Sequence, residues 1–406
     1  MTDDHAHHGF TRRGLLQAGA AAGIAASPLM FAPAAFGQTR ADPNRILVIL
    51  ELSGGNDGLN TVVPYGDDAY YRHRPKIGLR KERLLTLDDH YGLNGGMTGL
   101  HKLYKDGKVA IVHGAGYADP SFSHFTSMAY WHTAAPNSGE QYGWVGRLAD
   151  AMAPNAPANF LINIGATQSL AVRAHRHVPV VFDNPANFTR EMFFEEGETL
   201  RAPPEQGRAV TASQGFLRDI ARSANDSSAL VRKAWGDYRS PVDYGITDLG
   251  LRRVAAMIGA GLPARLYYTA YANNAFDTHV TQNDLHGRLL TYTSDAISAF
   301  MQDMARLGRA NDVTLMVFSE FGRRVPENTS LGTDHGAANV MFVIGDKVKG
   351  GHYGERPSLT KLDAGDNLPF TTDFRRVYAT MEQSWLGVPP ATPLLNGSFQ
   401  PLPLIA

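Results

Sequence analysis

Residues 45–60, RILVILELSGGNDGLN, determine the fold that we expect. Residues 45–52 form a nearly continuous apolar run without polar alternation, which is typical of a strand covered on both faces. Two glycines follow directly, and they let the backbone turn sharply and approach a ligand closely. Asp57 lies in this turn. The stretch therefore predicts a buried strand whose carboxyl end carries polar chemistry.

Five further apolar runs are similar to the first, at residues 108–112, 160–164, 265–271, 312–318 and 340–344. Helical patterns lie between these runs, at residues 97–106, 123–133, 144–152, 211–238, 248–260, 284–307 and 373–386. Strands that alternate with helices predict an α/β fold, with a doubly wound and mostly parallel sheet that is flanked by helices. We expect a single domain over residues 39–406, with a loop-rich insertion at about residues 183–245.

The composition excludes several classes of protein. The chain has 406 residues, with 38 Lys and Arg, 39 Asp and Glu, and a net charge of −1. This balance argues against a polybasic surface, so we expect no nucleic-acid partner. The chain has no cysteine, which excludes disulfides, thiolate metal ligands and a cysteine nucleophile.

The N-terminal residues have the pattern of an export signal. Arg12 and Arg13 precede an uncharged apolar run at residues 18–36 that is rich in Ala and Gly and ends in small residues. This pattern predicts a signal peptide, and the paired arginines predict the twin-arginine type. We expect the twin-arginine export machinery to carry the folded protein to the periplasm or out of the cell, with residues 1–38 removed. The alternative for this run is a membrane anchor that is retained. No other run reaches the roughly 18 apolar residues of a spanning helix, so we expect no stable anchor after cleavage.

Asp57 and the pair Asp277 and His279 each follow a predicted strand. A carboxylate at a strand end can bind a hard or borderline cation. A carboxylate and an imidazole two residues apart can face one ion, and this mixture of ligands suits zinc, iron or manganese. The alternative is structural: Asp57 caps the segment that follows it, and Asp277 caps a helix while His279 is solvated.

Glu320 and His335 lie in the segment after the fifth strand. An unpaired charge is rarely buried at the end of an apolar run, so Glu320 either binds metal or pairs with Arg323 or Arg324. Small residues follow His335 and allow close approach to a ligand, and Asp334 can instead orient an imidazole. Either arginine can bind an anionic ester group through two hydrogen bonds.

A segment with small residues and two serines follows the second strand. We expect a loop that begins at residues 113–116, HGAG, and continues through Ser121 and Ser123 into a helix. A hydroxyl at a helix N-terminus lies near free N–H groups, which favour an oxyanion and lower the cost of an alkoxide. Ser123 is the candidate nucleophile and Ser121 the second choice; the alternative is that either serine only caps the helix. We interpret His124 as a surface or supporting residue.

The motifs that mark several common enzyme classes are absent from the sequence. It has no G-x-S-x-G, no H-E-x-x-H, no G-x-x-x-x-G-K-[ST], and no G-x-G-x-x-G that opens a helix after a strand. Serine hydrolases of the usual type, zincins, P-loop proteins and dinucleotide-binding proteins therefore lack their marker here.

Taken together, the motifs resemble a bacterial family, the domain-of-unknown-function 1501 family. They are the paired arginines, SGGNDGLNTVVPYGD, SFSHF, FDTH, SEFGRR and GTDHG, in this order. The resemblance extends from about residue 45 to residue 386. This family is grouped with the alkaline phosphatase and sulfatase superfamily, so the resemblance implies an alkaline-phosphatase-like sheet with metal ligands on the loops at its strand ends.

The resemblance also implies a role for each candidate residue. It assigns nucleophilic attack to Ser123 and metal binding to Asp57, Asp277, His279, Glu320 and His335. The sequence departs from the superfamily at Phe321, where a second histidine ligand would follow Glu320. It also lacks the Cys/Ser-x-Pro-x-Arg signature of sulfatases.

We therefore expect an exported, metal-dependent hydrolase that cleaves phosphate or sulfate esters. One or two divalent cations, with zinc the first choice, would act together with Ser123, while Arg323 binds the anionic ester or glycan-type substrate. The missing histidine at Phe321 motivates an alternative, a non-catalytic exported binding or assembly protein with a degenerate metal site. A metal-dependent isomerase or mutase is a third possibility, although an exported protein rarely meets phosphorylated metabolites.

Overall fold

The computed structural model describes residues 42–155, 158–188, 227–390 and 393–406. The predicted signal at residues 1–38 and most of the predicted insertion at about residues 183–245 lie outside the described residues, so both stay predictions. Residues Arg40–Ala406 form one compact unit.

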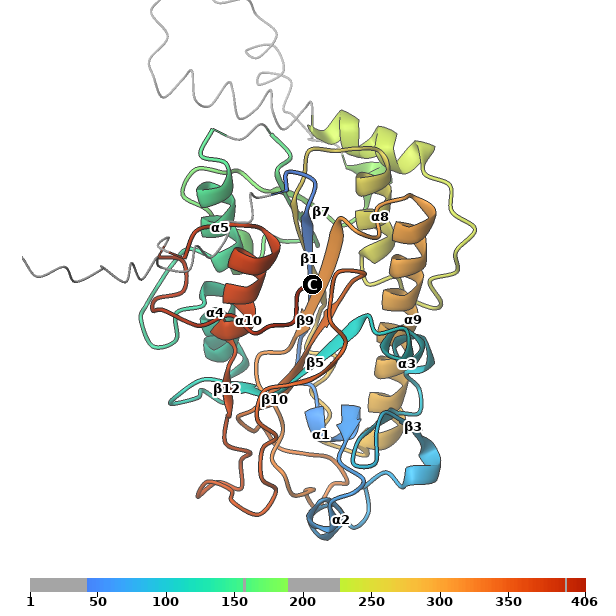
Figure 1. Cartoon of the computed structure of the whole chain (residues 1–406), viewed down its shortest axis with the longest axis vertical. Helices are drawn as coiled ribbons and strands as arrows, with labels where there is room; N and C mark the ends of the chain where they lie inside the picture. The colour runs from blue at the N-terminus through green and yellow to red at the C-terminus, as the bar shows by residue number, and fades with distance from the viewer. Residues whose placement is uncertain (1–41, 156–157, 189–226, 391–392) are drawn as a thin grey trace, which may run out of the picture. The chain divides into compact units, whose positions relative to one another are not determined.

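One sheet of nine strands organises the described residues (Figure 1). Eight strands lie in the order β11-β5-β10-β9-β1-β8-β6-β7, and β12 pairs with β5. Their bounds are β1 Ile46–Leu52, β5 Val109–Gly116, β6 Leu161–Ile164, β7 Val180–Phe182, β8 Leu266–Tyr271, β9 Val313–Phe318, β10 Asn339–Ile344, β11 Gly351–Tyr353 and β12 Thr372–Asp373. The strand β1 runs parallel to β8 and β9, and β6 runs parallel to β7 and β8. The predicted α/β fold with a mostly parallel sheet is confirmed.

Helices cover both faces of this sheet (Figure 1). One face packs against α3 (Thr98–Lys105), α8 (Leu251–Gly259) and α9 (Gln282–Arg306), and the other against α4 (His124–Thr133), α5 (Trp144–Met152) and α10 (Arg375–Ala379). The side chains of β1 divide in the same way: Val48 and Leu50 lie in the first core, and Leu47 and Ile49 lie in the second. Both faces of β1 are therefore buried, which explains why its sequence does not alternate.

The predicted elements in the described residues are present, and two details differ. The strand β5 continues to Gly116, so residues 113–116 are strand and not loop. The strand β10 runs antiparallel to both β5 and β9. Residues 319–338, which connect β9 to β10, contain no helix, and a connection without a crossover helix returns the chain in the opposite direction.

Several short elements were not predicted. Residues after β1 form α1 (Gly58–Thr61) and α2 (Asp68–His73), together with a small sheet in the order β2 (Val62–Val63), β4 (Gly92–Asn94) and β3 (Leu84–Thr86). The predicted helix at residues 373–386 is present as α10, which continues as the π-helix η4 (Thr380–Trp385). The short helical turns η1 (Lys81–Arg83), η2 (Leu170–Val172) and η3 (Pro185–Asn187) were not predicted. These elements are too short for a periodic pattern to identify them.

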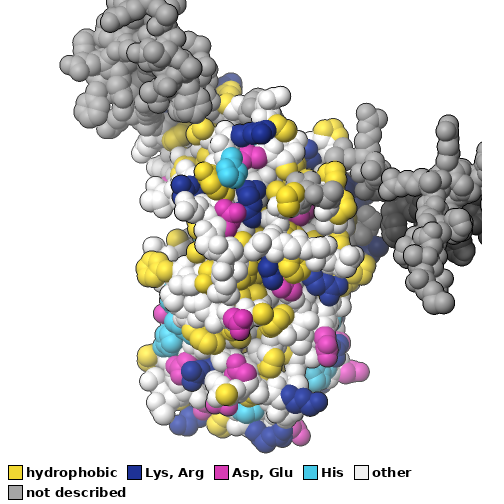
Figure 2. Space-filling view, turned by 90° about the vertical axis from the view of Figure 1, so that its left-hand side faces the viewer, with side chains coloured by type: hydrophobic (Ala, Val, Ile, Leu, Met, Phe, Trp, Pro, Cys, Tyr) yellow, Lys and Arg dark blue, Asp and Glu magenta, His cyan; other side chains and the backbone are white. Residues whose placement is uncertain are grey.

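The described surface carries charges of both signs. On the face shown in Figure 2, Lys and Arg side chains lie among Asp and Glu side chains and do not gather into one basic field. This arrangement agrees with the net charge of −1. No helix in the described part of the chain has the length and the apolar character that a bilayer crossing requires.

Candidate metal centre

Three loops at strand ends meet around Arg323. They follow β1, β8 and β9, and Arg323 is buried between them. Its guanidinium donates hydrogen bonds to the backbone oxygens of Gly54, Gly55, Phe276 and Thr333 and to Oδ1 of Asp277. Its donors are thus used inside the protein, and a substrate anion would have to displace one of these acceptors. The predicted role of Arg323 in binding the ester stays untested; in this structure the side chain joins the loops.

Two glycines let these loops lie in direct contact. Gly54 has a φ of +116°, and a Cβ there would lie 2.5 Å from the backbone nitrogen of Asp277. A Cβ on Gly332 would lie 2.1 Å from the backbone oxygen of His279. A side chain at either position would push apart the loops that carry the candidate ligands.

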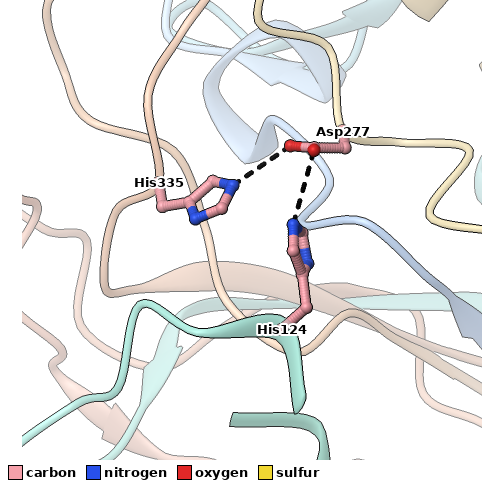
Figure 3. A group of neighbouring side chains, drawn as sticks. All are labelled: His124, Asp277 and His335. Carbon is pink, nitrogen blue, oxygen red and sulfur yellow. Dashed lines mark hydrogen bonds and ion pairs between the residues drawn. The ribbon is translucent and has the colours of Figure 1, made fainter. Parts of the chain in front are cut away.

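Asp277, His335 and His124 form one group of side chains that point toward one another (Figure 3). Each offers a ligand atom, and these atoms all lie within 4.8 Å of one another. Asp277 lies between the two imidazoles: its Oδ1 is 3.1 Å from Nε2 of His335, and its Oδ2 is 3.4 Å from Nε2 of His124. The three residues come from the loop after β8, the loop after β9, and the start of α4.

His279 lies beside this group. Its Nε2 is 2.9 Å from Oδ1 of Asp277 and 3.0 Å from Nε2 of His335. Its other ring nitrogen, Nδ1, is 3.5 Å from Oδ1 of Asp334. The structure thus brings together Asp277, His279 and His335, as we expected, and places Asp334 where it can orient an imidazole.

The partners of the other ring nitrogens fix the tautomers of two imidazoles. Nδ1 of His335 lies 2.8 Å from the backbone oxygen of Phe122, and Nδ1 of His124 lies 2.8 Å from Oε1 of Glu320. Both partners accept hydrogen bonds, so both Nδ1 atoms carry hydrogen, and in the neutral rings both Nε2 atoms present lone pairs. These lone pairs face the carboxylate of Asp277, and such an arrangement requires a proton or a cation between them.

Nε2 of His124 has a second property of a ligand atom. It is buried and has no hydrogen-bond partner among the described residues. A buried polar atom without a partner costs free energy, and a cation held together with Asp277 and His335 would remove that cost. Two imidazole nitrogens and a carboxylate oxygen are ligands that zinc prefers.

Glu320 supports His124 from inside the protein. Its side chain is fully buried, and its Oε1 also accepts a hydrogen bond of 2.9 Å from the backbone nitrogen of Gly54. The hydrogen bond from Glu320 is the main cause that raises the pKa of His124. In this structure Glu320 contacts His124 rather than Arg323 or Arg324. A carboxylate behind an imidazole is a common arrangement around metal ions, because it fixes the ring and makes it more basic.

The charge states of Asp277 and His335 suit a cation, whereas the raised pKa of His124 favours its protonated form, from which a cation would have to displace the proton. Burial alone would raise the pKa of Asp277, but the hydrogen bond from Arg323 is the largest of the effects that lower it to about 2. Burial lowers the pKa of His335. Near neutral pH the carboxylate is therefore ionised and His335 is neutral, and these are the forms that bind metal.

Asp57 contacts other residues than the group of Asp277, His335 and His124 does. It is fully buried, and its Oδ1 accepts hydrogen bonds from the backbone nitrogens of Leu59 and Asn60 at the start of α1. Its Oδ2 contacts Nη1 of Arg74 at 2.6 Å and Nε2 of Gln282 at 2.5 Å. Burial by itself would raise the pKa of Asp57, and the Arg74 charge is the largest of the effects that lower it. These contacts match the structural alternative, a cap, while metal binding by Asp57 stays a prediction.

Ser123 occupies the capping position of α4 without the capping bond. Its backbone precedes the helix, but its side chain makes no capping hydrogen bond, and the residue is exposed. Ser121 Oγ instead accepts a hydrogen bond of 3.3 Å from the backbone nitrogen of Ser123. The hydroxyl of Ser123 thus has no role as a cap, and it lies next to His124 in the chain.

His124 is the residue that we misjudged from the sequence. We interpreted it as a surface or supporting residue, but the structure makes it one of the three members of the group, with Asp277 between it and His335. The motif SFSHF carried a signal for this position, since the first residue of a helix that begins after a strand lies at the same edge of the sheet as the loops after parallel strands.

Comparisons with known proteins agree with part of the resemblance. Residues 249–385 match the family described as "Protein of unknown function (DUF1501)". This segment is less than half of the chain, and it includes Asp277, His279, Glu320 and His335 but not Asp57 or His124. For this segment the predicted resemblance is confirmed. No curated protein sequence matches the chain.

Three solved structures illustrate what the fold is similar to. The C-terminal periplasmic domain of EcEptC from Escherichia coli in complex with Zn has 13% identity and a TM-score of 0.42, covering 90% of this chain and 89% of that chain. PsFucS1 sulfatase from Pseudoalteromonas sp. has 11% identity and a TM-score of 0.42, covering 91% of this chain and 73% of that chain. The lipoteichoic acid synthase LtaP from Listeria monocytogenes has 10% identity and a TM-score of 0.38, covering 82% of this chain and 75% of that chain.

Proposed function

We propose that this protein is an exported, metal-dependent hydrolase of phosphate or sulfate esters, in which His124, Asp277 and His335 hold one divalent cation. The observation that carries the proposal is the geometry of this group, whose ligand atoms all lie within 4.8 Å of one another. The lone pairs of two imidazoles converge there on an ionised carboxylate. Zinc suits this set of two nitrogens and one oxygen, which leaves a coordination position open for a substrate oxygen.

The bound cation would polarise the ester and favour the ionised form of a nucleophile, as metal ions do in hydrolases. The chain's own residues bind and orient. Glu320 holds the His124 ring with its Nε2 toward Asp277, and Arg323 fixes the Asp277 carboxylate by a hydrogen bond of 2.7 Å. His279 lies next to the group, where it can serve as a further ligand or exchange protons with the substrate.

Ser123 is the proposed nucleophile. Its hydroxyl lies at the start of α4, where free backbone N–H groups stabilise negative charge. The serine oxygen forms a bond to phosphorus or sulfur, the ester bond breaks, and the alcohol leaves with a proton. Water then cleaves the serine ester and releases the phosphate or sulfate.

The proposal is tested by the metal content of the mature chain. We expect about one equivalent of zinc after purification without a chelator, and less than about a tenth of an equivalent in His335→Ala, because a ligand is lost. His175, an exposed histidine elsewhere, provides the control: His175→Ala should keep its zinc. Less than a tenth of an equivalent in the wild type after zinc is supplied would contradict the proposal.

Hydrolysis of aryl phosphates and aryl sulfates then tests catalysis. We expect turnover in the zinc-loaded wild type and loss of turnover with full zinc content in Ser123→Ala. Turnover that persists in Ser123→Ala would move the nucleophile to Ser121 or to water.

A non-catalytic binding or assembly protein is the second candidate function. It is favoured by the fact that Arg323 directs its hydrogen bonds to internal acceptors, so that it does not present a free guanidinium to an anionic substrate. Full zinc content without turnover of any aryl phosphate or sulfate would favour this candidate.

Export by the twin-arginine machinery is part of the proposal, and its support is the sequence pattern of residues 1–38. Replacement of Arg12 and Arg13 by Lys should retain the protein inside the cell, because the paired arginines identify the signal. Cell fractionation measures this directly.

A further inference from the structure

Large apolar side chains are exposed on residues that adjoin the candidate ligands in the chain. Phe125 is 90% exposed and Phe122 is 41% exposed, and these two residues flank His124. Val280 is 60% exposed and directly follows His279. Apolar residues exposed singly are ordinary, but a group of them around a polar site marks a binding surface.

Backbone hydrogen bonds hold the segments that carry these apolar residues together at the group. The backbone oxygen of Phe122 is the partner of Nδ1 of His335 at 2.8 Å. Leu331, which is 37% exposed, accepts a hydrogen bond of 2.9 Å from the backbone nitrogen of Gln282, just after Val280 in the chain. The start of α4, the loop after β8 and the loop after β9 thus each supply both a candidate ligand and an exposed apolar side chain.

The same segments offer little positive charge. Residues 53–61, 117–133, 272–283 and 319–338 contain only two Lys or Arg residues, Arg323 and Arg324. Arg323 is buried and hydrogen-bonded to internal acceptors. Arg324 is exposed but lies near Asp334 and Asp363, whose pKa values are lowered in part by its charge. A polyanionic chain, such as a highly sulfated glycan, would find no row of cations here.

We infer that the ester substrate of this site is amphiphilic, with one anionic group at the cation and a hydrocarbon or aromatic group against Phe122, Phe125 and Val280. The inference rests on the proposed function for its catalytic part. Burial of apolar surface would supply the binding free energy that the few cations cannot, since each buried methylene group strengthens binding. The rings of the two phenylalanines offer large contact areas at a small entropic cost.

The test uses the zinc-loaded mature protein and three alkyl phosphates, ethyl, hexyl and decyl phosphate, below their micelle concentrations, with alkyl sulfates as a second series. We expect kcat/KM for phosphate or sulfate release to rise at least about tenfold from the ethyl to the decyl ester. Phe125→Ser should remove most of this rise, so that the ethyl and decyl esters have similar values of kcat/KM. Ile246, which is 78% exposed, supplies the matched control: Ile246→Ser should change neither.

Binding is measured separately with ethylphosphonate and decylphosphonate, which are not hydrolysed. Tighter binding of decylphosphonate that Phe125→Ser weakens would support the inference even if no ester is turned over, and the proposed catalysis alone would then be wrong. Equal kcat/KM and equal binding across chain lengths would overturn the inference. It would also be overturned if Phe125→Ser only converts a dimer to a monomer in sedimentation, because the apolar surface would then join two copies of the chain.

Discussion

Asp57 and Asp277 are two carboxylates on neighbouring loops at strand ends, and they differ in what surrounds them. Each contacts a buried arginine, Arg74 at 2.6 Å for Asp57 and Arg323 at 2.7 Å for Asp277. The further partners of Asp57 are donors, whereas Asp277 is shared by imidazole nitrogens. A carboxylate that is fully satisfied by donors supports the fold, whereas one that faces lone pairs has room for a cation.

The largest expected effect is the loss of stability when Asp57 is replaced. Asp57→Ala leaves the charge of Arg74 buried without its partner, so we expect the free energy of unfolding to fall by about 3–5 kcal/mol. Urea denaturation of the metal-free protein measures the change. His335→Ala removes a half-buried neighbour of Asp277, and we expect it to lower the free energy of unfolding by less than about 1 kcal/mol.

The opposite result would exchange the two roles. If Asp57→Ala keeps its stability and loses zinc, Asp57 is a metal ligand as the sequence first indicated, and the contrast between the two carboxylates fails.

The region around Asp57 should also differ in how its stability depends on pH, because it contains the buried histidine His286. It is buried beside Asp57, and its Nε2 lies 2.9 Å from Oδ1 of Asn56. Burial is the main cause that lowers the pKa of His286 to about 4, below its ordinary value of 6.5. The unfolded chain therefore takes up this proton first, and its contribution to stability is present above about pH 6.5 and is lost as the pH falls toward 4. The loss amounts to about 3 kcal/mol at most.

His286→Gln removes this part of the pH dependence. We expect the stability difference between the wild type and His286→Gln to shrink as the pH falls, as measured by urea denaturation at several pH values. If the free energy of unfolding depends on pH in the same way in both proteins, His286 is not held neutral. The region around Asp57 would then tolerate charge better than its burial suggests.

The smallest effect concerns Glu320. Glu320→Gln keeps an oxygen that accepts from the backbone nitrogen of Gly54 and from Nδ1 of His124, but it loses the negative charge that makes the ring more basic. We expect zinc affinity to fall about 10–100-fold, as for other changes behind a ligand, and calorimetric titration of zinc measures it.

A matched control is Glu51 in β1, because its partner His132 lies on the same helix as His124. Glu51 accepts from His132, near the other end of α4, at 2.8 Å, so Glu51→Gln changes a similar pair away from the candidate centre. Unchanged zinc affinity in Glu320→Gln, or an equal loss in Glu51→Gln, would contradict the supporting role of Glu320.

The sheet could be predicted from the sequence because its strands are covered on both faces. Continuous apolar runs such as residues 45–52 and 312–318 are typical of such strands when helical patterns separate them. The reversed direction of β10 could not be predicted, since it depends on what the chain does over residues 319–338, where no periodic pattern exists. The short strands after β1 escaped prediction for the same reason.

The candidate centre was predicted in part. Asp277, His279 and His335 were found because they follow strands, and position along the chain is enough to bring such residues to one edge of a sheet. The contacts of Asp57 could not be foreseen, because Arg74 reaches it from the end of a helix that carries no pattern of its own. His124 was missed because the sequence does not say which side of α4 faces the sheet edge.

The ligand group also determines when a cation can bind. His124 precedes the middle of the chain, while Asp277 and His335 come from its later part, so an incomplete chain cannot present all of them. Metal would therefore bind only after the last strand-end loop has docked, and it would slow unfolding without speeding the early steps of folding. A cell would then have to supply the metal to a finished molecule.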